Sequence, residues 1–386
     1  MKKEWPTYYK YFLLGVFLLV LCLPLLQKKL TLFELKPLSG AIEAPVAPGF
    51  GWMDWMDGKY QSLKENQIKE SIGFYPLLIR LYNQQQYFLY NDTHAQGVIV
   101  GKEDYLYERA YIEAYLGMDY LGEDIIQDKV RKLRRISDTL KTKNIELVVL
   151  LAPGKGTFYS NYFPDKYNSA PIKRNNYESY RDAFHSTGIH LLDFQNWFLS
   201  MKGRTPYPLF SKGGIHWSYY GEVLSGDSLI KYMQQLLPNY QIPSLEITKV
   251  ISDGEIRERD NDIREGLNLL LNNFSEFNLA YPSFGLVVRS QDKNKEKANV
   301  LVVSDSFYWG LFNWGMSRDV FNNSDFWYYN EMIYPESYEK ETRVQDIDMK
   351  ARVESNQAVL LICTDGNLHK FAFGFIDQLY QQYFPE

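Results

Sequence analysis

Hydrophobic and polar positions follow two patterns after residue 50. Between Trp52 and Tyr90, apolar side chains recur at three- and four-residue spacing, which predicts helices. After Tyr90, the pattern of residues 97–107 predicts two strands around a glycine turn. In the rest of the chain, continuous apolar runs alternate with amphipathic stretches. The apolar runs predict buried parallel strands at 145–152, 189–194, 299–303, 326–329 and 358–363, and the amphipathic stretches predict helices at 123–143, 175–186, 222–237 and 337–355. This alternation predicts an α/β fold, a parallel sheet flanked by helices on both faces.

The N-terminus carries one long apolar run. Residues 11–26 are uncharged and lie between Lys10 and Lys28, and no small-residue cleavage site follows them. We therefore expect residues 1–30 to be an uncleaved signal anchor, an N-terminal transmembrane helix, rather than a cleaved signal peptide, with the main domain outside the cytoplasm. A Pro- and Gly-rich linker at 31–50 and one domain at 51–383 would follow, in which the polar stretch 245–298 is an insertion or a peripheral segment.

Composition excludes several function classes. The net charge is −5 and no basic stripe is present, which argues against a nucleic-acid partner. The two cysteines, Cys22 and Cys363, suggest neither a disulfide framework nor a cysteine-based zinc site, and no His or acid cluster has metal-ligand spacing. No cofactor is expected. Aromatic residues make up 16% of the chain, which suits sugar stacking as well as ordinary cores.

Several side chains that could take part in catalysis or ligand binding come after the predicted strands. Ser306 follows the strand at 299–303, Asn367 follows the strand at 358–363, and Lys155 follows the strand at 145–152. His216 lies in a Gly-rich loop before a helix. Because ligands bind beyond the carboxyl ends of parallel strands, these side chains are expected at one edge of the sheet.

The residue types suit nucleophilic catalysis. Ser306 needs a base such as His216 to accept its proton, and the resulting oxyanion needs donors such as the Ser306 N–H and the Asn367 amide. Each residue also has an ordinary structural interpretation: Ser306 as a helix cap, His216 as a structural histidine and Asn367 as a turn residue. His369 is the main rival base.

The motifs together resemble a known family. V-S-D-S-F resembles the nucleophile block of SGNH hydrolases, and D-G-N resembles their Gly-x-Asn block. The order His216, Ser306, Asn367 is permuted and resembles the alginate O-acetylation proteins, the AlgX/AlgJ-like group. GVIVGKEDYLY, VVLLAPGKGTFYSNYFP and GIHWSYYGE resemble further blocks of that group. The resemblance implies a circularly permuted SGNH-hydrolase-like (flavodoxin-like) fold, with Gly366, Lys155 and Trp217 as further candidates for oxyanion or substrate binding.

One position departs from the family pattern. The family's His block often has an acid two residues before the histidine, and this chain has Gly214 there. Without a carboxylate, the imidazole lacks the partner that fixes its tautomer. Three alternatives follow: a Ser–His dyad, an acid from elsewhere such as Asp305 or Asp227, or a site that binds without turnover.

The resemblance implies O-acetyl transfer to a cell-surface or exported polysaccharide, or its de-acetylation, outside the cytoplasm. It also implies a membrane-bound O-acyltransferase as the acetyl source. The alternative from another class is a non-catalytic carbohydrate-binding or assembly protein on the same fold, which Gly214 favours. A secreted lipase-like hydrolase is less consistent with the sequence because no G-x-S-x-G elbow is present.

Overall fold

The computed structural model describes residues 7–40, 49–93, 95–271, 276 and 278–385, so part of the predicted anchor (1–6) and of the predicted linker (41–48) lies outside the described residues. The chain divides into two compact units: Met1–Gln96 with Arg264–Asn273, and Gly97–Ile263 with Phe274–Glu386. The sequence predicted one domain from residue 51, whereas residues 51–96 group with the N-terminal segment, because their helices pack on one another and on the apolar helix.

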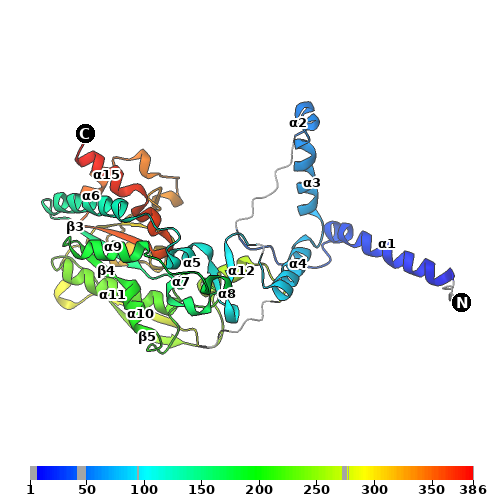
Figure 1. The fold of residues 1–386 in the computed structure, drawn as a ribbon, viewed down its shortest axis with the longest axis horizontal. Coiled ribbons are helices and arrows are strands. Elements are labelled where there is room, and N and C mark those ends of the chain that lie inside the picture. The colour runs from blue at the N-terminus through cyan, green and yellow to red at the C-terminus, as the bar shows by residue number, and fades with distance from the viewer. Residues whose placement is uncertain (1–6, 41–48, 94, 272–275, 277, 386) are drawn as a thin grey trace. The chain divides into compact units, whose positions relative to one another are not determined.

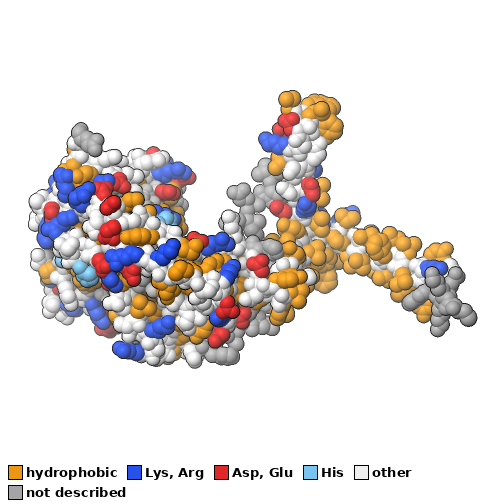
Figure 2. All heavy atoms as spheres, in the orientation of Figure 1, with side chains coloured by type: hydrophobic (Ala, Val, Ile, Leu, Met, Phe, Trp, Pro, Cys, Tyr) orange, Lys and Arg blue, Asp and Glu red, His pale blue; other side chains and the backbone are white. Residues whose placement is uncertain are grey.

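The first unit is built from helices (Figure 1). They are α1 (Thr7–Leu30), α2 (Trp52–Met56), α3 (Lys59–Ser71) and α4 (Tyr75–Tyr90). Helix α1 is long and apolar enough to cross a membrane by length and composition, and Figure 2 shows hydrophobic side chains along it. The α3–α4 junction packs against α1 at Gly73, where a Cβ atom would lie 2.2 Å from the Pro24 carbonyl oxygen.

The second unit contains a six-stranded sheet in the order β4-β3-β10-β7-β8-β9, parallel except for the β8–β9 pair. Its strands are β3 (Glu146–Ala152), β4 (His190–Asp193), β7 (Val300–Ser304), β8 (Phe326–Tyr328), β9 (Met332–Tyr334) and β10 (Ala358–Thr364). The three central strands β3, β10 and β7 are almost wholly buried, as their continuous apolar runs predicted. Strand β4 was predicted to be buried, but it is half-buried because it forms the sheet edge.

Helices cover both faces of this sheet. Helices α6 and α15 lie on one side of β3, and α10 and α11 lie on the other (Figure 1). The helices of this unit are α5 (Arg109–Leu116), α6 (Glu123–Lys141), α7 (Lys155–Phe158), α8 (Asp165–Asn168), α9 (Asn176–His185), α10 (Phe194–Met201), α11 (Tyr219–Leu236), α13 (Tyr308–Asn313), α14 (Met349–Glu354) and α15 (Phe375–Tyr383); α12 (Asp262–Gly266) crosses the boundary between the units in sequence. The main core lies between the sheet and the α6, α9 and α15 layer.

Two short antiparallel pairs complete the unit. Strands β1 (Val98–Val100) and β2 (Leu106–Glu108) form the hairpin predicted at 97–107. Strands β5 (Ser244–Ile251) and β6 (Tyr281–Val287) pair within the polar stretch 245–298, for which no strands were predicted. Most side chains of β5 are exposed, so this strand lacks the apolar run that marks the buried strands.

The prediction of a helix at 337–355 is largely wrong. Before residue 349 the range contains only two short 3₁₀ turns, at Glu336–Tyr338 and Val344–Asp346. The Ser337 hydroxyl donates to the Thr342 carbonyl oxygen and accepts from the Thr342 N–H, so a side chain replaces helical hydrogen bonding there. Helix α14 begins only after Asp348, whose carboxylate caps it by accepting from Ala351 N–H at 3.0 Å.

Candidate functional site

Ser306 lies just beyond the carboxyl end of β7. The preceding residue, Asp305, is fully buried, and its Oδ2 accepts hydrogen bonds from the Thr364 N–H (2.9 Å) and the Thr364 hydroxyl (2.8 Å). Its Oδ1 accepts from the Phe307 N–H at 3.1 Å. Asp305 therefore ties the end of β7 to the end of β10 and fixes the turn that carries Ser306.

His216 reaches Ser306 from a loop ninety residues earlier. Its Nε2 lies 2.9 Å from Ser306 Oγ, the distance of a hydrogen bond. The loop is anchored on both sides: the next residue, Trp217, is buried, and Ser218 caps α11 by accepting from the Gly221 N–H. The imidazole packs against the Phe307 ring at a centroid distance of 4.9 Å. The structure therefore brings the predicted nucleophile and base together.

Asp262 completes the arrangement from the stretch that was predicted to be peripheral. Its Oδ2 lies 2.6 Å from His216 Nδ1, and its Oδ1 accepts from the backbone N–H of Ile215 (2.9 Å) and of Ile263 (2.8 Å). Because a carboxylate only accepts, Nδ1 carries the proton and the Nε2 lone pair faces the Ser306 hydroxyl. The three side chains have the geometry of a Ser-His-Asp triad.

The predicted sources of an acid were wrong. The structure places Asp262, rather than Asp305 or Asp227, at the imidazole. Asp305 is engaged by Thr364 on the far side of Ser306, and Asp227 lies on α11, where it accepts from Lys231 at 2.6 Å. Of the alternatives left open by Gly214, the arrangement matches an acid supplied from elsewhere.

Gly214 leaves the space that Asp262 occupies. A Cβ atom on Gly214 would lie 2.7 Å from Ser211 Oγ, 3.0 Å from the Arg259 carbonyl oxygen and 3.2 Å from Asp262 Oδ1. An aspartate at position 214 would thus place a second carboxylate against the first. Like charges at this distance repel, and the crowding is added to that repulsion.

We therefore expect Gly214→Asp, which restores the family pattern, to lower activity rather than raise it. Ester hydrolysis by the variant should fall at least about tenfold, and its melting temperature should fall by several degrees, in line with a loss of about 1–3 kcal/mol from overpacking. Assays of p-nitrophenyl acetate hydrolysis and thermal unfolding measure both. A gain in activity would contradict the assignment of Asp262.

The surroundings of His216 favour its protonated form. Burial lowers the pKa of His216, but the hydrogen bond and charge of Asp262, with smaller contributions from Asp305 and Glu108, raise it by more. The pKa therefore lies above its ordinary value of 6.5. A base of raised pKa accepts the serine proton more readily and holds it as the imidazolium next to Asp262.

A cavity of about 260 Å³ opens at Ser306 and His216. Its wall includes Trp217, Trp309 and the buried Glu222, which forms an ion pair with Arg259. Burial raises the pKa of Glu222 to about 7, although Arg259 acts in the opposite direction. The volume suits a small acyl group more than a long chain.

The other predicted site residues lie near Ser306 and His216, but not all of their side chains point toward these two residues. The Asn367 Nδ2 donates to Asp305 Oδ2 (3.0 Å) and to Thr364 Oγ1 (3.3 Å), two acceptors that lie only 2.8 Å apart and therefore on one side of the nitrogen. Lys155 is fully buried and its ammonium donates to the Lys212 and Gly214 carbonyl oxygens, both at 2.7 Å. Lys155 thereby holds the loop that precedes His216.

Two other predicted residues contribute packing. The Trp217 ring lies 5.2 Å from the Phe307 ring and lines the cavity. Gly366 lies against Tyr111, whose ring atoms would be 3.2 Å from a Cβ atom on Gly366. The rival base, His369, is placed with its Nδ1 3.5 Å from Asp119 Oδ2. In the described part of the chain, no group of three or more His, Cys, Asp or Glu side chains is arranged to hold a metal ion.

The sequence analysis missed Asp262 and Tyr329. Tyr329 follows β8, and its side chain lies close enough to Ser306 for Ser306 to influence its pKa. Burial and the charge of Asp305 raise the pKa of Tyr329, so its hydroxyl stays a neutral donor at physiological pH. Tyr329 is the last residue of the strand predicted at 326–329, so its place at the carboxyl end of a parallel strand was a signal that could have found it. No local pattern marks Asp262.

Comparison with known proteins finds one family model that matches the central part of the chain. Residues 98–262 match the model of the SGNH hydrolase-like domain, acetyltransferase AlgX. This range covers somewhat less than half of the chain and includes His216 and Asp262, whereas Ser306 lies beyond it. No curated protein sequence matches.

Solved structures give weaker similarities. The O-acetyltransferase domain of Pseudomonas putida AlgJ is 17% identical, with 74% of this chain and 99% of that chain covered and a TM-score of 0.44. Pseudomonas aeruginosa AlgX is 16% identical, with 76% and 69% covered and a TM-score of 0.44. Bacillus cereus PatB1 is 14% identical, with 72% and 99% covered and a TM-score of 0.44. At these values the likenesses carry no argument about individual residues.

The family match and the mixed α/β architecture with its mostly parallel sheet agree with the fold class expected from the motifs. The predicted resemblance is confirmed: over residues 98–262, this chain is similar to the SGNH hydrolase-like domain of the acetyltransferase AlgX.

Proposed function

We propose that this protein is a membrane-anchored, extracytoplasmic serine O-acetyltransferase that acetylates a polysaccharide, with hydrolysis of the acetyl group as its side reaction. The observation that carries this proposal is the hydrogen-bonded series Asp262–His216–Ser306 over the carboxyl edge of the sheet. A buried structural histidine needs neither a serine hydroxyl on one nitrogen nor a carboxylate on the other. Both together favour acyl transfer.

The reaction would proceed in two halves. Ser306 Oγ attacks the acetyl carbonyl carbon while His216 Nε2 takes the hydroxyl proton, and the leaving group departs with that proton from Nε2. A sugar hydroxyl then attacks the acetyl-serine and gives its proton to Nε2. Collapse of the second intermediate transfers the acetyl group to the sugar and returns the proton to Ser306 Oγ. Water in place of the sugar gives acetate.

The oxyanion needs donors at the nucleophile. The first donor is the Ser306 backbone N–H, because Ser306 lies at the strand-to-helix turn. Asn367 is the second predicted donor: the acceptors of its Nδ2, Asp305 Oδ2 and Thr364 Oγ1, lie together on one side, which leaves its other N–H for the oxyanion. The neutral hydroxyl of Tyr329, whose side chain lies close to Ser306, is a further candidate.

The substrate class and the location follow from the family. The matched family is described as an acetyltransferase, and the group that the motifs resemble acts on an exported polysaccharide. Helix α1 would anchor the protein so that the catalytic unit lies outside the cytoplasm, next to the membrane that α1 crosses. A membrane-bound O-acyltransferase would supply acetyl groups there. The non-catalytic alternative rested on Gly214, and the carboxylate of Asp262 at His216 removes that basis.

Trapping the acetyl-enzyme tests the proposal. The full chain in detergent micelles is mixed with p-nitrophenyl acetate, quenched in acid and digested for mass spectrometry. We expect release of p-nitrophenol and one acetyl group on the peptide that contains Ser306. Addition of a neutral oligosaccharide should speed loss of this group and yield an acetylated sugar. An acetyl group found only on lysines, without catalytic p-nitrophenol release, would refute the proposal.

A further inference from the structure

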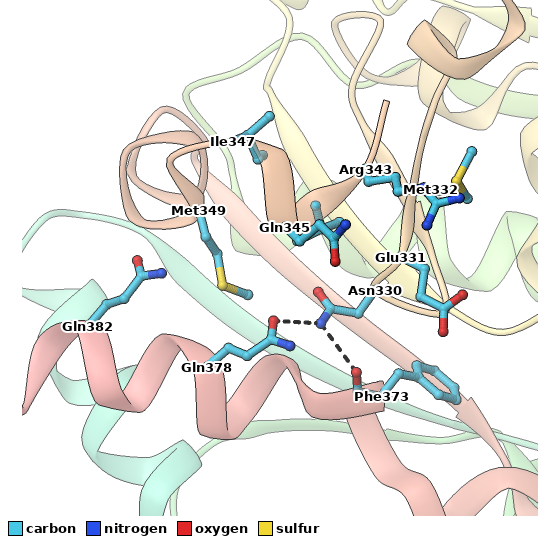
Figure 3. A pocket seen from close by; sticks show the side chains of 11 residues that line it. Asn330, Glu331, Met332, Arg343, Gln345, Ile347, Met349, Phe373, Gln378 and Gln382 are labelled. Carbon is cyan, nitrogen blue, oxygen red and sulfur yellow. Dashed lines mark hydrogen bonds between the residues drawn. The ribbon is translucent and has the colours of Figure 1, made fainter. Parts of the chain in front are cut away.

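A second and larger cavity, of about 780 Å³, lies in the same unit as Ser306 (Figure 3). Its lining comes from the loop after β8, the segment from β9 to the start of α14, Phe373, and helix α15. The volume lies in the range of small-molecule and sugar-binding clefts. Nothing in the acetyl-transfer scheme uses it.

The floor of this cavity carries an unsatisfied polar atom. Asn330 is 5% exposed, and its Nδ2 donates to the Phe373 carbonyl oxygen (3.2 Å) and to Gln378 Oε1 (3.0 Å). The Phe373 carbonyl only accepts, so the amide nitrogen must face it and the orientation of the side chain is fixed. Among the described residues, Asn330 Oδ1 has no hydrogen-bond donor, and Figure 3 shows it turned toward the side of Gln345. A buried acceptor of this kind calls for a donor from a ligand or water.

The rim of the cavity is rich in neutral amides. Gln345, Gln378 and Gln382 are exposed side chains that line it. The charged lining residues, Glu331 and Arg343, have opposite signs, and Arg343 also pairs with Glu341. Amides both donate and accept, as sugar hydroxyls do, and the cavity has no net charge to attract an ion.

The cavity is linked directly to the nucleophile. Tyr329 and Asn330 are consecutive residues in the left-handed backbone region, with φ values of 52° and 55°. This turn sends the Tyr329 side chain to Ser306 and the Asn330 side chain to the cavity floor. The Tyr329 ring also packs edge-on against Phe373, a lining residue, at 5.0 Å. A left-handed conformation at a tyrosine is costly, and such cost concentrates at functional sites.

We propose that this cavity binds a neutral sugar unit of the acceptor chain, with Asn330 Oδ1 accepting from a sugar hydroxyl at its floor and the glutamines hydrogen-bonding at its rim. The inference rests on the proposed function, because it supplies the acceptor subsite of that reaction. It names the acceptor as an uncharged saccharide.

Calorimetric titration of the full chain in detergent micelles tests this. The probes are maltohexaose, cellohexaose, laminarihexaose and chitohexaose, with hexagalacturonate as the anionic comparison. At least one neutral probe should bind, and the Ser306→Ala variant should bind it with an unchanged Kd. The double variant Gln345→Ala/Gln382→Ala should raise Kd by about tenfold or more, as expected for the loss of two hydrogen bonds. Both side chains are exposed, and Gln382 Oε1 also accepts from the Lys350 N–H at 3.0 Å.

Gln381→Ala is the matched control, because Gln381 is an exposed neighbour on α15 that does not line the cavity. It should change Kd less than twofold. Binding of hexagalacturonate alone, of no probe at all, or an equal effect of Gln381→Ala would overturn the inference. These outcomes are independent of the acetyl-enzyme experiment: saccharide binding without acetylation of Ser306 refutes the proposed reaction alone, and acetylation without saccharide binding refutes this subsite alone.

Discussion

Replacement of Ser306 by alanine is expected to lower the rate of acetyl transfer and of p-nitrophenyl acetate hydrolysis by about 10⁴–10⁶-fold. The hydroxyl oxygen is the atom that forms the covalent intermediate, and among the described residues no other nucleophile has a hydrogen bond to His216 Nε2. Because Ser306 is only half-buried and loses a single oxygen, the fold should persist. Initial rates, with the acetyl-peptide signal from mass spectrometry, measure the loss.

Ser304→Ala is the matched control for this experiment. Ser304 lies two residues earlier at the end of β7, fully buried, and its hydroxyl has no hydrogen-bond partner in the described part of the chain. Removing such a hydroxyl costs little stability and should leave turnover within about twofold. Equal losses in the two variants would mean that the effect is structural, and Ser306 would then lose its role as nucleophile.

Replacement of Asp262 by asparagine is expected to lower kcat by about 10³–10⁴-fold. The Ile215 and Ile263 N–H groups donate to Oδ1, so the new amide would place its oxygen there and turn its NH₂ group toward His216 Nδ1. An NH₂ donor forces Nδ1 to accept, and the ring proton moves to Nε2. The imidazole can then no longer take the proton of Ser306.

The pH dependence of kcat/KM distinguishes a change in the protonation of His216 from a general loss of folded structure. Only neutral His216 acts as a base, so in the wild type kcat/KM should rise with pH through the His216 pKa, above its ordinary range. Burial lowers this pKa, and Asp262 supplies the largest opposing contribution. In Asp262→Asn the acidic limb should therefore move to lower pH while the plateau falls. An unmoved limb would contradict the assignment.

Asp227→Asn serves as the control, because Asp227 pairs with Lys231 on α11 and does not touch the imidazole. It should leave both the plateau and the limb unchanged. Melting curves of both variants check that neither loss comes from unfolding.

Much of the sheet was predictable because its central strands are buried on both faces. The runs ending at Ala152, Ser304 and Thr364 contain almost only apolar residues, a pattern that depends on local sequence alone. Ser306 was predictable for a related reason, since residues that follow such strands share one edge. His216 was predictable from its Gly-rich loop and the motif GIHWSYYGE instead. Strand β9 was missed.

The carboxylate at His216 was not predictable from local pattern. Asp262 begins a five-residue helix in an acidic, polar stretch after β5, and nothing in its neighbours distinguishes it from Asp253 or Asp260. Its position depends on the path of the chain between β5 and β6, which only tertiary packing determines. The 337–355 helix failed for the opposite reason: local side-chain hydrogen bonding at Ser337 overrode a helical spacing.

The space left by Gly214 has a consequence for how such chains are classified. A census of SGNH-type acetyltransferases that requires an acid two residues before the histidine would discard this chain as a pseudoenzyme. Here a glycine at that position accommodates the carboxylate of Asp262, which comes from the segment between β5 and β6, so the two positions have to be read together. Chains that carry Gly-x-His together with an aspartate between the histidine and the serine block should be counted as candidates for activity.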